Sequence, residues 1–191
     1  PLGNRVLDEL VAANAGSRTP MPVFNKALDD REPEENWPLF IGHPEIILVE
    51  GWCLGALPQS EEELATPLND LERNDDADGR WRRYVNQQLD GPYKDFFARL
   101  DLLIMMKAPS FDAVKRWRTE QEHKLAERYR AAPKVGEESG RPAPQVRIMG
   151  DAELERFVMH YERITRHSLD EMPARADVLL ELDEDHTLTR A

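Results

Sequence analysis

The chain has 191 residues, of which 40% are hydrophobic, and carries a formal net charge of −12 with a pI near 4.9. This length suits a single domain over residues 1–191, and the acidic excess argues against nucleic acid as the partner because few cations are available to replace its counterions. The single cysteine, Cys53, excludes an internal disulfide. No run of about 20 apolar residues could span a membrane, so we expect a cytoplasmic protein.

The first residues predict a short helix and a charged loop. Asn4 is suited to cap a helix that carries Val6 and Leu10 on one side, and Gly16 lies beyond its expected end. The loop 19–31 follows, and its prolines favour an extended backbone.

The run Ile46–Val49 predicts a strand that is covered on both faces, as in parallel sheets. Glu50 follows at the carboxyl end of this strand, where ligands bind in open α/β sheets. A carboxylate there is able to hold Mg²⁺ or to accept a proton, and Gly51 allows a sharp turn. The alternative is a solvated acid beside a turn glycine.

An acidic connection extends from Gly51 to about residue 79, and helical segments follow it. Trp81, Tyr84, Val85 and Leu89 share one helical face. Trp52, Trp81 and Trp117 are expected in the core rather than at a ligand. The remaining predicted elements are a strand over 102–106, a helix over 112–130 capped by Ser110, a mobile loop over about 133–145, a helix from Asp151 and a strand over 176–182.

Short apolar strands that alternate with helices predict an α/β fold in which helices flank a parallel sheet. The sequence supplies only the strands 46–49, 102–106 and 176–182, whereas a sheet of this kind usually has about five. We therefore expect a fold that is incomplete at its N-terminus.

Polar residues lie on or near the apolar arc of the helix predicted over 112–130. Gln121 falls inside the arc and Arg118 lies close to its edge. Because polar groups on a core-facing stripe need partners, we expect both to face a cleft or a ligand. The alternative for Arg118 is an i,i+4 ion pair with Glu122. Arg116 points about 160° away and fits a solvated position.

Several runs of residues, in order along the chain, match the pattern of one kinase family. They are Phe24–Arg31, Val49–Gly55, Trp81–Asn86, Ala108–Phe111, Trp117–Glu122 and Phe157–His167. Together they closely resemble the bacterial branch of the D-glycerate 3-kinase family, which belongs with P-loop kinases of the phosphoribulokinase and uridine kinase type. The resemblance implies a P-loop kinase fold and transfer of a phosphoryl group from ATP, with Mg²⁺, to a small hydroxy acid such as glycerate.

The chain departs from this family at its beginning. Such kinases carry a Gly-rich phosphate loop that ends in Gly-Lys-Ser or Gly-Lys-Thr, and no Gly-x-x-x-x-Gly-Lys-Ser/Thr occurs in these 191 residues. The loop supplies backbone donors and a lysine to the phosphates. We therefore expect the chain to be the carboxyl-terminal portion of such a kinase and to be inactive alone.

The resemblance also implies roles for individual residues. Glu50 corresponds to the acid that follows the Walker B-like strand, and it would hold Mg²⁺ or orient the acceptor in catalysis. Lys26, Asp29 and Arg31 lie in the loop that contacts the phosphate acceptor, although any exposed loop has a similar composition. Asn25 stands where the family commonly has Asp, which weakens a catalytic role at that position.

Arginines of the predicted helix over 112–130 correspond to lid residues that close over the transferred phosphoryl group. By this resemblance Arg118 is catalytic and Arg116 binds the cofactor ATP. Alternatives remain: a kinase-like domain that binds without catalysing, or a kinase for another hydroxy acid, a nucleoside or pantothenate. The sequence leaves the oligomeric state open.

Overall fold

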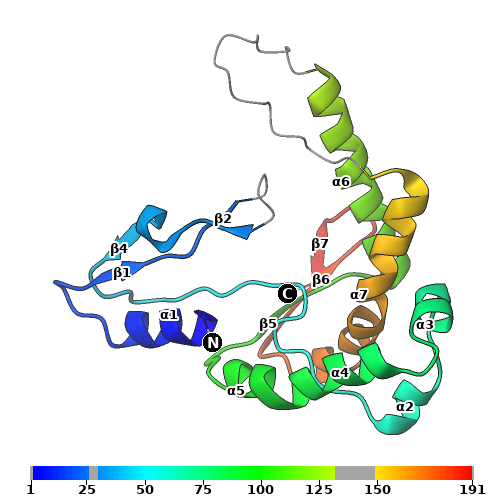
Figure 1. Cartoon of the computed structure of the whole chain (residues 1–191), viewed down its shortest axis with the longest axis horizontal. Helices are drawn as coiled ribbons and strands as arrows, with labels where there is room; N and C mark the ends of the chain where they lie inside the picture. Colours follow the sequence, from blue (N-terminus) through cyan, green and yellow to red (C-terminus); the bar gives the residue numbers. More distant parts are fainter. Residues whose placement is uncertain (1, 26–29, 132–148, 191) are drawn as a thin grey trace. The chain divides into compact units, whose positions relative to one another are not determined.

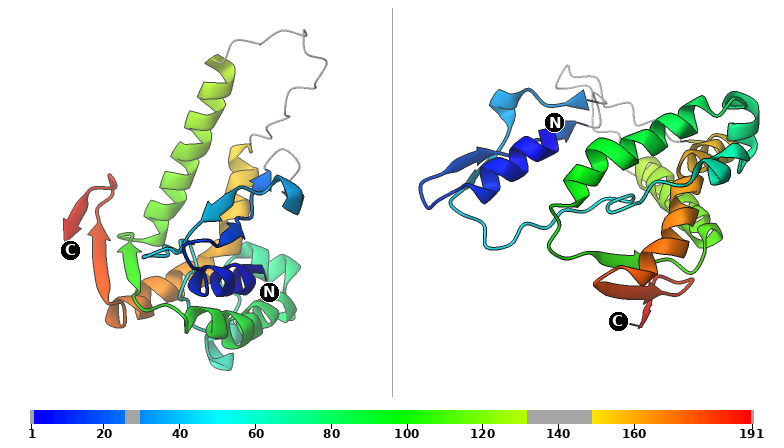
Figure 2. Two further views of the ribbon diagram at one scale, coloured as in Figure 1. Left: turned by 90° about the vertical axis from the view of Figure 1, so that its left-hand side faces the viewer. Right: turned by 90° about the horizontal axis from the view of Figure 1, so that it is seen from below.

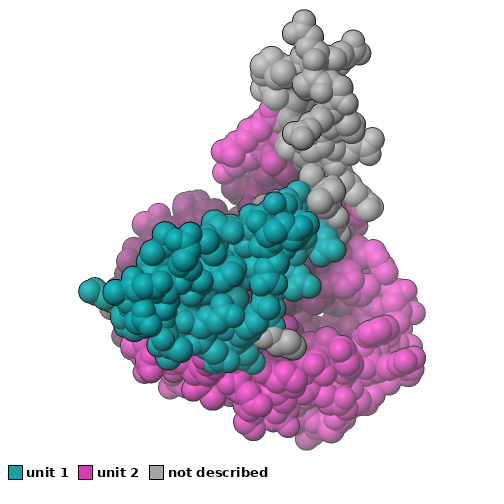
Figure 3. All heavy atoms as spheres, turned by 60° about the vertical axis from the view of Figure 1, so that its left-hand side comes forward, with its two compact units in different colours: residues 1–50, 135–147 teal, residues 51–134, 148–191 magenta. Residues whose placement is uncertain are grey.

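The structure is a computed structural model that describes residues 2–25, 30–131 and 149–190. It contains two compact units, one formed by residues 1–50 and 135–147 and the other by residues 51–134 and 148–191 (Figure 3). A single domain over residues 1–191 stays a prediction. The loop expected over about 133–145 lies outside the described residues and stays a prediction.

The first unit combines one helix with short antiparallel strands. Helix α1 (Leu2–Val11) buries Val6 and Leu10; it begins at Leu2, so Asn4 lies within the helix rather than capping it. The strand pairs are β1 (Arg18–Pro20) with β4 (Leu39–Ile41) and β2 (Phe24–Asn25) with β3 (Asp30–Arg31), and the 3-10 turn η1 spans Glu34–Asn36.

The prediction of a strand over Ile46–Val49 is wrong for this structure. The segment is irregular and pairs with no described strand. Ile46 and Leu48 are 85% and 83% exposed. An apolar, β-branched run becomes a strand only when a neighbouring strand completes its hydrogen bonds. The sequence pattern contains the preference for a strand but not the partner.

The second unit begins with short helices whose starts are fixed by capping. Ser60 and Glu63 form a reciprocal capping box at the start of α2 (Glu61–Ala65), and Asn69 caps α3 (Asp70–Asp75). The chain continues through α4 (Arg80–Gln88), the π-helical turn η2 (Leu89–Tyr93) and α5 (Lys94–Phe97). Gly91 has non-helical dihedrals and Pro92 follows it, which explains the break before α5.

A mixed sheet forms the other part of this unit, in the order β5-β6-β7 (Figures 1 and 2). Strands β5 (Ile104–Lys107) and β6 (Val178–Leu182) are parallel, with Lys107 opposite Glu181. This confirms the strands expected over 102–106 and 176–182, although each begins two residues later than predicted and β5 extends to Lys107. Strand β7 (Leu188–Arg190) was not predicted and pairs antiparallel with β6, so the sheet is not purely parallel.

Two long helices connect β5 to β6 along the chain, and they pack against each other (Figure 1). They are α6 (Phe111–Ala131) and α7 (Asp151–Glu171), and the 3-10 turn η4 (Met172–Ala174) leads on to β6. Phe111 of α6 and Leu154 and Val158 of α7 form a buried cluster. Helices long and apolar enough to cross a membrane are absent from the described part of the chain.

Candidate functional site

Strands β5 and β6 end together, and a charged pair marks this edge of the sheet. Lys107 Nζ lies 3.2 Å from Glu181 Oε1, and both side chains are about one-third exposed. Ser110 Oγ then accepts a hydrogen bond of 3.1 Å from the Ala113 N–H, as expected of a helix cap. Ligands of open α/β sheets bind at this edge, so Lys107 is a cation near the expected site that sequence reasoning missed.

The first turns of α6 contact the turn between β6 and β7. The Arg116 guanidinium donates hydrogen bonds to the Glu184 carboxylate and carbonyl, and the nearby anion raises the pKa of Arg116. Trp117 Nε1 donates to Glu184 O at 2.8 Å, and its ring lies 4.2 Å from the His186 ring. Arg116 is therefore exposed but paired, and binding of ATP by this residue stays a prediction.

Arg118 makes the i,i+4 ion pair that was the alternative to a ligand contact. Its Nη1 lies 2.7 Å from Glu122 Oε2, and its guanidinium lies 5.5 Å from the centre of the Phe157 ring. Nothing in this geometry tests a role with a phosphoryl group. The pair uses one of five guanidinium N–H donors, so a ligand contact is chemically compatible with it.

Glu122 is a buried charged residue of α6, and the sequence pattern identified it as a partner of Arg118 but not its burial. The residue is buried and also accepts a hydrogen bond of 3.0 Å from the Met149 N–H. Burial alone raises the pKa of Glu122, but the Met149 N–H and the Arg118 guanidinium outweigh it and lower the pKa. Gln121, which was expected inside the apolar arc, is exposed. The two side chains point about 100° apart on α6, so the buried face of the helix includes the residue that follows the predicted one.

The predicted acceptor and metal residues belong to the first unit. Glu50 is exposed on the irregular segment, and Arg31 of β3 lines a hollow of about 590 Å³ together with Arg5, Glu34 and Trp37. Lys26 and Asp29 lie outside the described residues. Because Arg116 and Arg118 belong to the second unit, neither unit contains the whole predicted site, and the roles of these residues stay predictions.

Within residues 2–25, 30–131 and 149–190, no group of three or more His, Cys, Asp or Glu side chains could hold a metal ion. Glu50 could therefore contribute only its own carboxylate oxygens to a bound Mg²⁺. Cys53 is partly buried, and burial raises the pKa of its thiol, so the thiolate needed for nucleophilic or metal chemistry is disfavoured.

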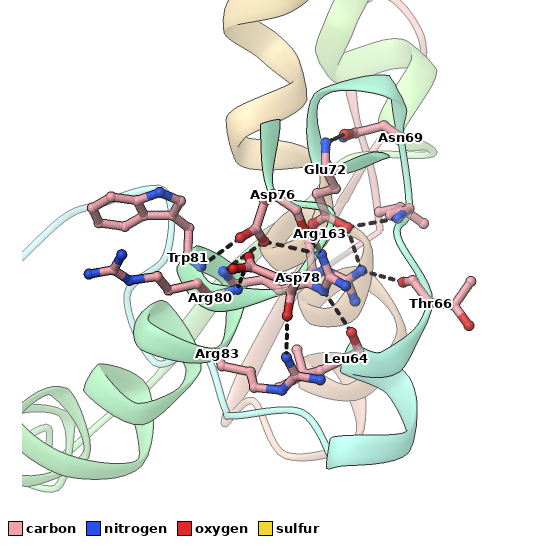
Figure 4. A network of polar contacts seen from close by, with 12 residues as sticks. Leu64, Thr66, Asn69, Glu72, Asp76, Asp78, Arg80, Trp81, Arg83 and Arg163 are labelled. Atoms are coloured by element: carbon pink, nitrogen blue, oxygen red, sulfur yellow. Dashed lines mark hydrogen bonds and ion pairs between the residues drawn. The ribbon is translucent and has the colours of Figure 1, made fainter. Parts of the chain in front are cut away.

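A network of buried ion pairs holds α2, α3 and α4 against α7 (Figure 4). Arg82 of α4 lies 3.1 Å from Asp76, with side chains only 4% and 8% exposed. Arg163 of α7 lies 2.6 Å from Glu72 and donates further hydrogen bonds to the carbonyls of Glu63 and Thr66. Every partner is satisfied, which is the condition under which buried charges are tolerated.

Gly79 supports this network through its backbone. Its φ of +72° is in the left-handed region, and an added Cβ would lie 2.5 Å from an Arg83 nitrogen and 2.9 Å from an Arg82 nitrogen. The burial of Arg82 also corrects the predicted face of this helix. Trp81 is 62% exposed, and Tyr84 and Val85 are exposed as well, so of the predicted apolar face only Leu89 is buried.

Comparisons with known proteins give a kinase-like fold. No family model matches the chain. A protein of Schizosaccharomyces pombe described as the uncharacterized kinase mug58 is 26% identical over 166 residues, which cover 83% of this chain and 52% of that protein. This chain therefore spans about half the length of that relative.

Two solved structures share the fold. D-glycerate 3-kinase from Cryptococcus neoformans var. grubii superimposes with a TM-score of 0.61 at 18% identity, over 91% of this chain and 59% of that one. The YGR205w protein superimposes with a TM-score of 0.53 at 19% identity, over 97% of this chain and 62% of that one. The resemblance inferred from the sequence is thus confirmed as a likeness in fold.

Proposed function

We propose that these 191 residues belong to an ATP-dependent kinase that phosphorylates a small hydroxy acid such as glycerate. The observation that carries the proposal is the shared fold with D-glycerate 3-kinase over nine-tenths of this chain. The family-like runs of residues and the distant kinase relative support it.

In this proposal, the residues divide into those for the acceptor and those for the phosphoryl group. Lys26 and Arg31 would pair with the carboxylate of the acceptor, and Asp29 would accept hydrogen bonds from its hydroxyls. Glu50 would hold Mg²⁺ or orient the acceptor. Arg118, with Arg116, would stabilise the charge that spreads over the phosphoryl oxygens during transfer.

The described residues do not form a complete site for ATP and Mg²⁺. The sequence contains no Gly-Lys-Ser/Thr loop, and the described residues offer no cluster of metal ligands. Mg²⁺ in kinases is usually held by one or two carboxylates together with the phosphates themselves, so Glu50 would be insufficient without a phosphate cradle. We propose that this chain is inactive alone.

The test is phosphorylation of D-glycerate by ATP and Mg²⁺, measured as ADP release and as phosphoglycerate formed. The 191-residue chain is compared with the protein expressed from its natural gene together with any coding sequence upstream. We expect transfer only where a phosphate loop is supplied. Transfer by the chain alone would contradict the proposed inactivity, and a preference of the longer protein for uridine or pantothenate would contradict the proposed acceptor.

A second candidate is a kinase-like domain that binds without catalysing, and the absent phosphate-loop motif favours it. The two candidates differ in what precedes the chain in its gene. A natural gene that encodes no Gly-Lys-Ser/Thr loop, with a product that binds glycerate but releases no ADP, would support the binding domain over the enzyme.

A further inference from the structure

A cavity of about 450 Å³ lies within the second unit, between the helices α2, α3 and α4 and the helix α7. It is separate from the sheet edge and from the arginines of α6 considered above. Its volume is within the range of about 300–1,000 Å³ that is typical of sites for small molecules.

The walls of this cavity are mainly apolar. Leucines come from the connection before α2 and from the short helices, and a methionine and an isoleucine come from α7. The apolar residues that line it include Leu57, Leu64, Leu71, Leu89, Met159 and Ile164. Burial of an apolar group against such walls is favourable by roughly 25 cal/mol per Å².

The charged residues that line the cavity already neutralise one another. The pairs are Arg82 with Asp76 at 3.1 Å, Arg163 with Glu72 at 2.6 Å and Arg156 with Asp75 at 2.8 Å. An ionised ligand would have to compete with one of these internal partners, whereas an uncharged ligand would leave all three pairs intact.

Trp81 lines the cavity and is largely exposed. Its ring lies outside the ion-pair network in Figure 4. Tyr84 packs against it edge to face, with ring centres 6.3 Å apart, and the Arg80 guanidinium lies 5.9 Å from it. An exposed indole beside an apolar hollow is a surface on which a flat ring stacks well.

His160 supplies a polar contact in the same cavity. Its Nδ1 lies 3.1 Å and 3.2 Å from the carbonyl oxygens of Arg156 and Phe157. A neutral ring that donates from Nδ1 to a carbonyl keeps Nε2 as an acceptor. A ligand with one N–H or O–H donor would match it.

We propose that this cavity binds a small, uncharged molecule with a flat apolar ring and one hydrogen-bond donor. The site is independent of phosphoryl transfer, because none of the residues proposed for the kinase reaction lines it.

The test uses indole as the probe and indole-3-acetate as its anionic counterpart, with binding to the 191-residue chain followed by ligand-detected NMR. We expect indole to bind about tenfold more tightly than indole-3-acetate, since an anion meets only cations that are already paired. Failure of indole to bind at millimolar concentration, or equal affinity for the two probes, would overturn the proposal.

Two variants locate the site. Val85→Phe adds bulk to a cavity residue and should weaken indole binding about tenfold, whereas Leu188→Phe adds similar bulk on exposed β7 and should not change it. Asp75→Asn releases Arg156 from its pair and should narrow the preference for indole over indole-3-acetate. Indole binding that Val85→Phe leaves unchanged would overturn the location. A preference unchanged in Asp75→Asn would overturn the charge argument even if Val85→Phe failed to fold.

Discussion

The irregular segment 46–50 exposes apolar side chains, whereas the helical region around Arg82 buries a charged one, which is the opposite of the usual pattern. Ile46 is 85% exposed, whereas the side chain of Arg82 is 4% exposed. The difference lies in the partners: the arginine finds a carboxylate and backbone carbonyls within its own unit, and the apolar segment pairs with no described strand. Burial in this chain therefore follows the partners that are available, and hydrophobicity alone does not predict it.

The largest expected effect comes from removing a buried cation. Arg82→Met leaves Asp76 buried without its partner, and we expect the free energy of unfolding to fall by about 3–5 kcal/mol, measured by urea denaturation. Arg73→Met is the matched control, because Arg73 forms an exposed pair with Asp70 and should cost less than about 1 kcal/mol. Equal losses of unfolding free energy in both variants would show that the buried ion pair stabilises the fold no more than an exposed one.

Removing the charge of buried Glu72 should have a smaller effect that depends on pH. Burial raises the pKa of Glu72, but the Arg163 guanidinium and the Leu68 N–H lower it below its ordinary value of 4.5. The carboxylate therefore stabilises the fold above pH 4.5, and this contribution is lost as the pH falls through the lowered pKa.

We expect Glu72→Gln to lose about 2 kcal/mol at pH 7 and progressively less below the ordinary pKa of 4.5, as measured by urea denaturation across pH. Glu62→Gln, on the exposed side of α2, is the control and should follow the wild type. A loss for Glu72→Gln that stays constant down to pH 2 would contradict the predicted sign.

Variants of Arg118 distinguish a structural role of this side chain from a role in phosphoryl transfer. Arg118→Ala removes the ion pair of buried Glu122 and leaves it the hydrogen bond from the Met149 N–H, and we expect the free energy of unfolding to fall by about 1–2 kcal/mol. Arg118→Lys should recover most of that stability. If Arg118 also contacts the phosphoryl group, Arg118→Lys will remain poorly active in a protein that supplies the phosphate loop, because Lys cannot reproduce the planar fork. Full activity of Arg118→Lys would confine the residue to its structural pair.

The smallest effect is expected in the exposed segment. Leu48→Thr should change the free energy of unfolding of this chain by less than about 0.5 kcal/mol, because the side chain has little burial to lose. Thermal or urea denaturation would detect a larger change. A loss above about 1.5 kcal/mol would mean that Leu48 is buried in solution, and the contrast with Arg82 would disappear.

Local sequence patterns were sufficient for the elements that depend on nearby residues. Periodicity and turn chemistry predict these elements: the helices around 112–130 and from Asp151, the Ser110 cap, and the strands that end near Lys107 and Leu182. Strand β7 escaped prediction because its Leu-Thr-Arg sequence is too short for an alternating pattern.

The buried network escaped prediction for a different reason. Arg163 and Glu72 are 91 residues apart, and no local periodicity reports such a contact. The burial of Arg82 was not predicted either, because the apolar pattern places its neighbour Trp81 on the buried face of the helix. Of the candidate site, the sequence pattern identified the i,i+4 partner of Arg118, but it did not identify the buried state of Glu122 or the cation Lys107.

The long sequence separation between Arg163 and Glu72 affects when the helical region folds during synthesis. Glu72 leaves the ribosome 91 residues before its guanidinium partner, a delay of roughly 5–20 s at typical translation rates. Until then, Glu72 lacks the guanidinium with which it forms its ion pair. The ion-pair network of the helical region is therefore completed late in synthesis, only after Arg163 has emerged.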